Sequence, residues 1–318
     1  MISTEIQTIV IALGGNALST PHGDGSVDEQ RAAIRQSANE IVKIYKQGWR
    51  VVLTHGNGPQ IGRLLLQQEH AKGLTPPLPF DICGAMTQGQ IGYLLQLGLQ
   101  EVLHSDGIEN SAVTLLTQVV VHPKDPAFQN PTKPVGPFYS EVEANELHQT
   151  KKFSMKKMGT GDRPYRRVVP SPKPLKIVEE ASIRLLVEAG HLVIACGGGG
   201  VPVICEKGRL RGVEAVIDKD LAAERMASML GAEVLLILTD VERVAIRFGK
   251  PDQQDLKRIS LSEAKRHMAS GEFPAGSMGP KIEAAIRFLE SGGKRAVITS
   301  LEKAQAALDA QAGTEILP

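Results

Sequence analysis

Short runs of apolar residues alternate along the chain with longer stretches in which apolar positions recur every three or four residues. The run from Thr8 to Leu13 is too short for a helix and is followed at once by two glycines, so it predicts a buried strand. A helix is expected next, because Ser26 and Glu29 have the spacing of an N-terminal capping box. Gly48 stands where a helix commonly ends.

The same alternation returns in the second half of the chain. The predicted strands are residues 8–13, 49–54, 191–196, 233–239 and 295–299. Besides the helix between Ser26 and Gly48, the predicted helices are residues 177–189, 220–230 and 281–289. Strands that alternate with helices form a largely parallel sheet covered on both faces, so we expect an α/β fold.

The middle of the chain departs from this alternation. Nine of the 19 prolines lie between residues 123 and 174, and residues 151–176 hold nine lysines and arginines. Proline removes a hydrogen-bond donor from a strand and fixes φ, so we expect this segment outside the central sheet. We interpret it as a protruding subdomain or lid, with a solvated basic loop as the alternative.

Composition narrows the class of protein. With 36 Lys+Arg against 35 Asp+Glu, neither nucleic acid nor an anionic membrane is expected as the main partner. No apolar run approaches the roughly 18 residues of a membrane-spanning helix, and residues 1–8 lack the basic start of a secretory signal. The three cysteines, Cys83, Cys196 and Cys205, show no CxxC spacing, which favours a reducing, cytoplasmic location.

Glycine-rich segments follow several of the predicted strands. They are Gly14-Gly15-Asn16, His55 to Gly58 and Gly197 to Gly200, with Gly84 as a less clear case. In open α/β sheets, ligands bind beyond the carboxyl ends of the strands, where glycine lets backbone N–H groups approach an anion. One such segment could be only a tight turn, but several in one chain predict a phosphorylated or strongly anionic ligand.

A second group of residues combines basic and acidic side chains. Asp218-Lys219-Asp220 comes before a predicted helix, and Lys281 begins another. Phosphoryl transfer needs cations around the transferring group, Mg²⁺ on the phosphates, and alignment of the nucleophile with phosphorus. Two lysines held by one carboxylate would supply the cations. In the alternative interpretation the aspartates only cap the helix and Lys219 is solvated.

Other chemistries lack their motifs. The chain has no Walker A sequence, no HExxH motif and no Cys/His cluster, so we expect no protein-bound metal. Gly56 to Gly62 follows a strand with the spacing GxGxxxG rather than GxGxxG, which leaves a dinucleotide-binding oxidoreductase as a distant alternative. Cys196 is expected to be a small buried residue, and His55 to be structural rather than basic.

Several segments, taken together and in order, carry a family resemblance that covers nearly the whole chain. They are Ala12–Ala17, Thr54–Gln60, Ala85–Gly89, Asn130–Pro137, Val168–Pro174, Cys196–Gly200, Gly212–Asp220 and Gly276–Lys281. In this combination they resemble the carbamate kinases, within the amino acid kinase fold family.

The resemblance implies a three-layer αβα sandwich around a mainly parallel eight-stranded sheet, with a small protruding subdomain, and a homodimer. Within a single domain of residues 1–318, it implies a substrate-side lobe (1–122), the subdomain or lid (123–175) and a nucleotide-side lobe (176–318). It also implies reversible transfer of the γ-phosphoryl group of ATP to carbamate, which gives carbamoyl phosphate and ADP. We expect Mg²⁺ to be carried by the nucleotide and the reaction to run toward ATP synthesis.

The resemblance also assigns roles to single residues. Those on the phosphate path are Gly14, Gly15, Asn16, Gly198 and Gly199. Those at the carbamate or carbamoyl end are Asn57 and Gly58. Those of the nucleotide pocket are Thr239, Asp240, Val241, Phe248 and Met278.

The charged residues receive the catalytic roles. Lys219 and Lys281 are expected to neutralise the transferring phosphoryl group, and Asp220 to organise the two lysines. Lys133, at the hinge of the subdomain, is expected to swing toward the substrate. Carbamate is already an anion, so this chemistry needs no general base.

The chain departs from the family pattern near the expected adenine pocket. The family usually has Asp at the position of Glu242 and Asn at that of Arg247, and often an aromatic residue at that of Ala245. Residues 160–165 also depart from a family pattern close to Gly-Arg-Gly-aromatic. Two alternatives stay open: a kinase of another small acid that forms an acyl phosphate, and a weakly active paralogue that senses nucleotide or carbamoyl phosphate. The departures at Glu242 and Arg247 motivate the second.

Overall fold

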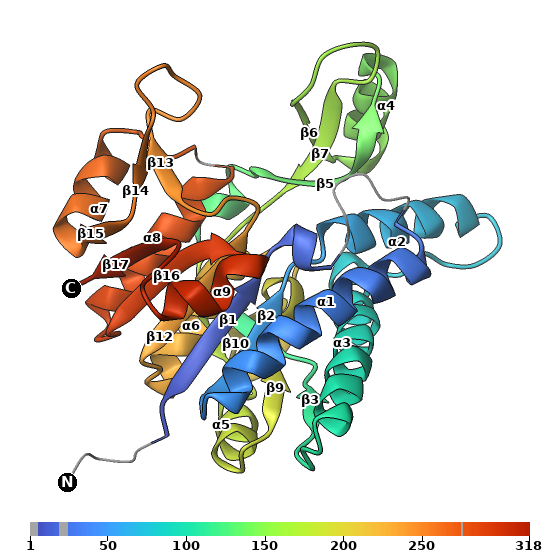
Figure 1. The fold of residues 1–318 in the computed structure, drawn as a ribbon. Coiled ribbons are helices and arrows are strands. Elements are labelled where there is room, and N and C mark those ends of the chain that lie inside the picture. Colours follow the sequence, from blue (N-terminus) through green and yellow to red (C-terminus); the bar gives the residue numbers. More distant parts are fainter. Residues whose placement is uncertain (1–5, 19–24, 275) are drawn as a thin grey trace, which may run out of the picture.

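A large, mainly parallel sheet forms the centre of the molecule (Figure 1). The computed structural model describes residues 6–18, 25–274 and 276–318, except for the side chain of Asn16, and within them the large sheet has eight strands. In spatial order the strands are β15 (Arg258–Ser260), β17 (Thr314–Leu317), β16 (Arg295–Ser300), β12 (Val234–Thr239), β1 (Thr8–Leu13), β2 (Arg50–His55), β9 (Leu192–Ile194) and β3 (Ala112–Thr114).

The strands at the centre of this sheet run in the same direction. β1 pairs in parallel with β12 and β2, and β2 pairs in parallel with β9, whereas β17 is antiparallel to β16. The carboxyl ends of β12, β1, β2 and β9 therefore lie at one edge of the sheet. Glycine segments follow β1, β2 and β9 there, as predicted. The weaker case was wrong, because Gly84 lies inside a helix.

Helices cover both faces of the large sheet. The helices of the described residues are α1 (Val27–Lys46), α2 (Gly58–Ala71), α3 (Phe80–Ser105), α4 (Glu141–Lys151), α5 (Glu180–Glu188), α6 (Lys219–Leu230), α7 (Leu261–Ala269), α8 (Met278–Glu290) and α9 (Ala304–Leu308). Of these, α4 lies away from the large sheet, in the segment 123–175. In β1, Ile9 and Ile11 pack with α1, α3 and α9 in one core. Val10 and Ala12 point the other way and pack with α5, α6 and α8 in the second core. This alternation confirms the predicted αβα layers.

The helix boundaries mostly follow the local signals. The Ser26 hydroxyl accepts a hydrogen bond from the backbone N–H of Glu29 and so caps α1, as expected. Gly48 has a φ of +89°, in the left-handed region that suits the residue after a helix. The prediction of a helix from residue 177 was wrong, because Ile177 ends a strand and α5 begins only at Glu180. Apolar residues alone did not separate the two elements.

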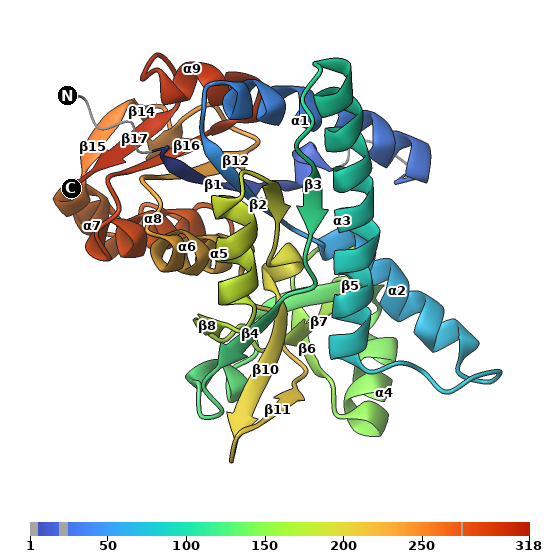
Figure 2. The ribbon, with the colours of Figure 1, turned by 90° about the horizontal axis from the view of Figure 1, so that it is seen from below.

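The proline-rich middle of the chain lies outside the large sheet. Its strands β5 (Lys133–Tyr139), β7 (Tyr165–Val169) and β6 (Ser154–Lys157) form a sheet of their own, which projects with α4 at the upper right of Figure 1. A further sheet has the order β11 (Arg209–Gly212), β10 (Val201–Glu206), β4 (Gln118–Val121) and β8 (Pro174–Ile177), and Figure 2 shows it from below. β13 (Val244–Ile246) pairs with β14 (Gln254–Leu256).

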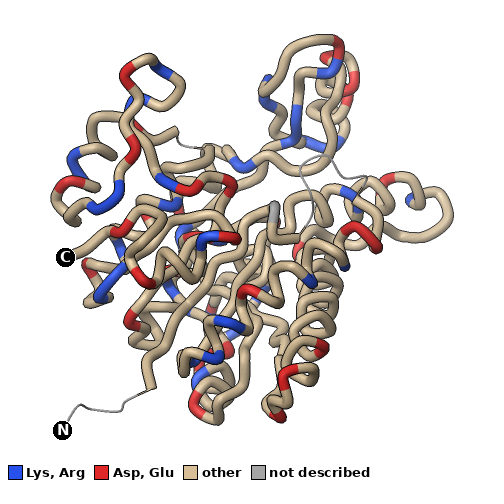
Figure 3. The backbone as a smooth tube through the Cα atoms, viewed as in Figure 1, with Lys and Arg blue, Asp and Glu red and all other residues tan. Residues whose placement is uncertain are grey.

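Charge is distributed over the outside of the molecule. Lysines, arginines, aspartates and glutamates are interspersed in Figure 3, whereas the central strands carry few of them. In the part of the chain that the structure describes, no helix is both long enough and apolar enough to span a bilayer. Residues 1–5 of the segment 1–8, for which we expect no secretory signal, lie outside the described residues.

Candidate active site

A cavity of about 230 Å³ opens at the carboxyl edge of the large sheet, and basic side chains line it. We call it the lysine cavity, because Lys133, Lys219 and Lys281 all contribute to its wall. Its other lining residues include Asn57, Gly58, Gly198 and Asp220. Segments far apart in the sequence therefore meet in one place.

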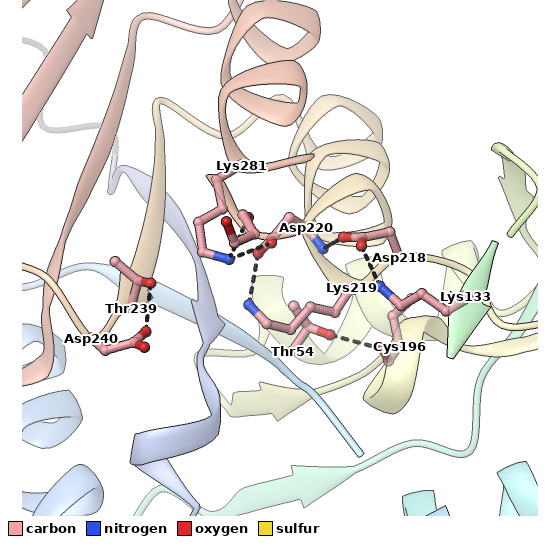
Figure 4. Close-up of polar contacts among 10 residues, drawn as sticks. Thr54, Lys133, Cys196, Asp218, Lys219, Asp220, Thr239, Asp240 and Lys281 are labelled. Atoms are coloured by element: carbon pink, nitrogen blue, oxygen red, sulfur yellow. Dashed lines mark hydrogen bonds and ion pairs between the residues drawn. The ribbon is translucent and has the colours of Figure 1, made fainter. Parts of the chain in front are cut away.

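Two lysines share a single buried carboxylate in this cavity (Figure 4). The Nζ atom of Lys219 lies 2.7 Å from Oδ1 of Asp220, and the Nζ atom of Lys281 lies 3.2 Å from Oδ2. The Asp220 side chain is 3% exposed, and those of the lysines are 16% and 15% exposed. Burial alone would raise the pKa of Asp220, but the two ammonium groups outweigh it and hold that pKa below its ordinary value.

Two helix N-termini bring these residues together. Lys219 and Asp220 begin α6, and the Asp218 side chain caps this helix by accepting a hydrogen bond from the backbone N–H of Asp220 at 2.9 Å. Lys281 lies in the first turn of α8, which packs against α6. The positive ends of both helix dipoles therefore add to the lysine charges, which favours an anion.

Lys133 reaches the site from the subdomain. Its Nζ atom donates to Oδ2 of Asp218 at 2.6 Å, across 85 positions of sequence. Lys133 is the first residue of β5, and its side chain is 37% exposed. Asp218 therefore has two partners, one in α6 and one in the subdomain, and Figure 4 shows all three lysines around the two aspartates.

The glycines that we predicted for the phosphate path divide into two groups. Gly198, with φ of +66°, lines the lysine cavity, and a Cβ atom there would come within 2.3 Å of Nδ2 of Asn57. Gly199 does not line it; a Cβ atom at Gly199 would lie 2.1 Å from the backbone oxygen of Ile217, so close packing requires this glycine.

The glycines after β1 also lie outside the lining of the lysine cavity. A Cβ atom at Gly14 would lie 2.6 Å from the backbone oxygen of Leu238, so Gly14 lets β1 and β12 end side by side. Among the described residues, no atom lies within 4 Å of the corresponding position at Gly15. The side chain of Asn16 lies outside the described residues.

A second cavity of about 260 Å³ lies beside the first, and we call it the Phe248 cavity. The residues predicted for a nucleotide pocket all line it: Thr239, Asp240, Val241, Phe248 and Met278. Sequence reasoning missed Phe273 and Pro274, which come from the loop between α7 and α8. Of the three departures from the family pattern, only Ala245 lines this cavity, whereas Glu242 and Arg247 do not.

Ser277 and Lys281 line both cavities. The two cavities therefore meet at the start of α8, and a molecule in one would face a molecule in the other across the Lys281 ammonium group. Such an arrangement suits the transfer of an anionic group between two bound molecules.

His55 and Cys196 have the structural character that the sequence predicted. Burial lowers the pKa of His55 to about 4, although the backbone oxygen of Gly56 lies 2.9 Å from its Nδ1 atom. The ring is therefore neutral near pH 7. Burial raises the pKa of the Cys196 thiol, and the Cys196 backbone N–H donates to the Thr117 hydroxyl at 3.0 Å.

Metal ligation by the protein has little support in the donor set. Across residues 6–18, 25–274 and 276–318, no cluster of three or more His, Cys, Asp or Glu side chains could hold a metal ion. Each carboxylate oxygen of Asp220 already accepts from a lysine.

Known proteins share both the sequence and the fold. The chain matches the model of the Amino acid kinase family over residues 7–300. It is 50% identical over 314 residues to a carbamate kinase of Pyrococcus horikoshii, with 98% of this chain and 99% of that relative covered. A carbamate kinase of Clostridium perfringens is 48% identical over 313 residues, with 97% and 99% covered.

Solved structures agree with the sequence relatives. The carbamate kinase from Giardia lamblia bound to AMP-PNP superposes with a TM-score of 0.93 at 46% identity, over 98% of each chain. The chain therefore belongs to the amino acid kinase family, within which it groups with the carbamate kinases.

Proposed function

We propose that the protein catalyses reversible phosphoryl transfer between ATP and carbamate, with carbamoyl phosphate and ADP as the other pair. The observation that carries this proposal is the buried Asp220 carboxylate, which holds Lys219 and Lys281 where the two cavities meet. Close relatives called carbamate kinases support the choice of substrate.

In the direction of ATP synthesis, carbamoyl phosphate occupies the lysine cavity and ADP the Phe248 cavity. A terminal oxygen of the ADP β-phosphate attacks phosphorus, and the bond between phosphorus and the carbamoyl oxygen breaks. That oxygen keeps the bonding electrons and leaves as part of the carbamate anion, so no proton is transferred. Lys219 and Lys281 neutralise the phosphoryl oxygens while the negative charge of the two substrates comes together.

Lys133 and the loops have supporting roles in this proposal. Lys133 would exchange its bond to Asp218 for the phosphoryl group as the subdomain, residues 123–175, closes. Asn57 and Gly58 would hold the carbamoyl end, and Gly198 would let the loop after β9 approach it. Gly14 and Gly15 would border the path between the two substrates, with Gly199 needed for packing.

We propose that Mg²⁺ enters as part of the nucleotide substrate. Support comes from Asp220, whose oxygens are both engaged by lysines, and from nucleotide phosphates being strong ligands of Mg²⁺. The nucleotide base would lie against Phe248 and Met278. We also propose that the enzyme runs mainly toward ATP and works in the cytoplasm, where its thiols stay reduced; Cys83, Cys196 and Cys205 are all free.

A homodimer is the oligomeric state we propose. One face of α3 exposes Ile82, Met86, Tyr93 and Leu97, which follow one another at intervals of four, seven and four residues. Tyr93 is 60% exposed, and such a contiguous apolar stripe is typical of an interface. A second copy of the same stripe could cover it by a two-fold axis.

The test is ATP formation from ADP, Mg²⁺ and carbamoyl phosphate, measured with the purified chain in a coupled assay. Rapid turnover that requires carbamoyl phosphate would support the proposal, and a panel of other acyl phosphates would identify a different acceptor. Thermal stabilisation by nucleotide or carbamoyl phosphate without turnover would instead indicate a weakly active paralogue that senses these ligands. The matched variants are Lys281→Met, expected to lower kcat at least about 100-fold, and Lys265→Met on the surface of α7 as control.

A further inference from the structure

The segment Ala85–Gly89 belongs to the family resemblance, yet none of its residues lines the lysine cavity. It forms part of α3, where Thr87 and Gln88 are buried. Gln88 binds both backbone groups of Thr117: its amide donates to the Thr117 oxygen at 3.1 Å and accepts from the Thr117 N–H at 2.8 Å. The segment therefore supports the strands behind the cavity, and Thr87 supports the cavity itself.

Thr87 contacts the side chain of Asn57, which does line the cavity. The Asn57 amide donates from Nδ2 to the Thr87 hydroxyl at 2.8 Å. The same hydroxyl donates to the backbone oxygen of Gly84 at 2.6 Å. Its single proton is thus committed to Gly84, and toward Asn57 it can only accept.

This arrangement fixes which way round the amide lies. If the Asn57 amide were reversed, its Oδ1 atom would need the proton of Thr87, and two oxygens 2.6 Å apart at Gly84 would be left without a proton between them. Gly198 packs against the amide from the loop after β9. Nδ2 therefore faces the buried threonine, and Oδ1 remains available to a ligand in the cavity.

Asn57 does not use its side chain to cap the helix that it begins. It is the N-cap residue of α2, where an asparagine oxygen commonly accepts from the backbone of the first turn. Here the described side chain makes no capping hydrogen bond. The side chain is held by Thr87 instead, which leaves its carbonyl oxygen without a structural use.

We propose that Thr87 is a positioning residue that turns Oδ1 of Asn57 toward the carbamate or carbamoyl group in the lysine cavity. There Oδ1 accepts a hydrogen bond from the amino group of that substrate. This inference rests on the proposed function and adds the basis of its selectivity. An acyl phosphate with an amino group fits the site, whereas one with a methyl group in its place leaves Oδ1 desolvated and unpaired.

The experiment compares carbamoyl phosphate with acetyl phosphate as the phosphoryl donor to Mg²⁺-ADP, in the full chain. The readout is the ratio of the two kcat/KM values. Thr87→Val keeps the shape of the side chain but removes the acceptor of Asn57. We expect the ratio to fall about tenfold, as for the loss of one hydrogen bond. The fall should come from a lower kcat/KM for carbamoyl phosphate, while that for acetyl phosphate stays the same. Thr87→Ser keeps the hydroxyl and should keep the ratio.

Thr114→Val is the matched control, because its hydroxyl also donates to a backbone oxygen of α3, that of Gly92, at 3.0 Å, away from Asn57. Thr87→Ala releases the amide by a second route and should lower the ratio as Thr87→Val does. An unchanged ratio in both Thr87→Val and Thr87→Ala would overturn the inference alone. Absence of ATP formation from carbamoyl phosphate by the unaltered chain would overturn the proposed function and the inference with it.

Discussion

The structure predicts in most detail what happens when the carboxylate of Asp220 is removed. Asp220→Asn keeps the size of the side chain but removes its charge. One lysine can still donate to the remaining amide oxygen, whereas the other would face an amide N–H₂ group in place of an oxygen. Lys219 and Lys281 are then left about six-sevenths buried without a counter-ion.

The cost follows from this burial. Removing one partner from a buried ion pair costs about 3–5 kcal/mol, because the other charge stays out of water and unpaired. Since the lysines keep some access to water, we expect the free energy of unfolding at pH 7 to fall by about 3 kcal/mol. The lysines would also lose their alignment, so we expect kcat to fall at least about 100-fold.

The dependence on pH distinguishes this explanation from a general loss of packing. The folded protein holds the pKa of Asp220 below its ordinary value of 3.8, so the carboxylate stabilises the fold above that pH. This stabilisation is lost as the pH falls from 3.8 through the lower pKa of the folded protein. The free energies of unfolding of the wild type and of Asp220→Asn should therefore converge below that pKa. A packing defect would keep them apart.

Chemical denaturation and the ATP-forming assay measure the two effects. Asp106→Asn is the matched control: it removes the partner of Lys46, 2.9 Å away, from a pair in which both side chains are substantially exposed. That change should cost less than about 1 kcal/mol and leave kcat unaltered. If Asp220→Asn unfolded within 1 kcal/mol of the wild type, or kept a third of its kcat, the role given to the shared carboxylate would be refuted.

Three further predictions concern other parts of the molecule. The pKa of His55, lowered by burial from 6.5 to about 4, predicts that stability falls by about 2–3 kcal/mol between pH 6.5 and 4.5; in His55→Gln, this part of the pH dependence of unfolding should vanish. Arg247 has φ of +52°, which asparagine adopts more readily, so Arg247→Asn should raise the free energy of unfolding by up to about 1 kcal/mol and leave the KM for ADP unchanged. If the chain forms the proposed homodimer through the exposed face of α3, Tyr93→Lys should convert it to a monomer in light scattering. A dimer that persisted in this variant would show that the interface lies on another surface.

Much of the sheet could be predicted because its signals are local. Thr8–Leu13 and Arg295–Ser300 are short apolar runs, and each becomes a strand close to the predicted bounds. The start of α4 was missed although Ser140 and Glu143 form a capping box there. Its helix exposes most of its residues, so it lacks the apolar periodicity on which the predictions relied.

The candidate active site likewise has features that the sequence predicts and features that only the structure gives. Lys219, Lys281 and the carboxylate that organises them, Asp220, were all predicted from the sequence. The packing of α6 against α8 adds the geometry, in which each oxygen of Asp220 binds a different lysine. Thr87 lies in the resemblance segment Ala85–Gly89, but its role could not be predicted from the sequence, because that role depends on its contact with Asn57, 30 residues away in another element. Gly199 is the opposite example: the sequence marks it as part of a glycine motif, but the structure explains this glycine by its close packing against the backbone of Ile217.

Helix capping gives a further argument for where the anion binds. α1, α4, α6 and α7 each begin with a serine or aspartate whose side chain caps the first turn. α2 begins with Asn57, which is equally able to cap, yet in the described part of the chain its side chain makes no capping hydrogen bond and lines the lysine cavity instead. The start of α8 is different, because the backbone N–H of Gly279 donates to the Pro274 oxygen at 2.9 Å and Pro280 has no N–H group for Ser277 to cap. The first turn of α2 therefore presents backbone N–H groups without a side-chain cap beside the cavity, and phosphoryl oxygens are acceptors that suit them.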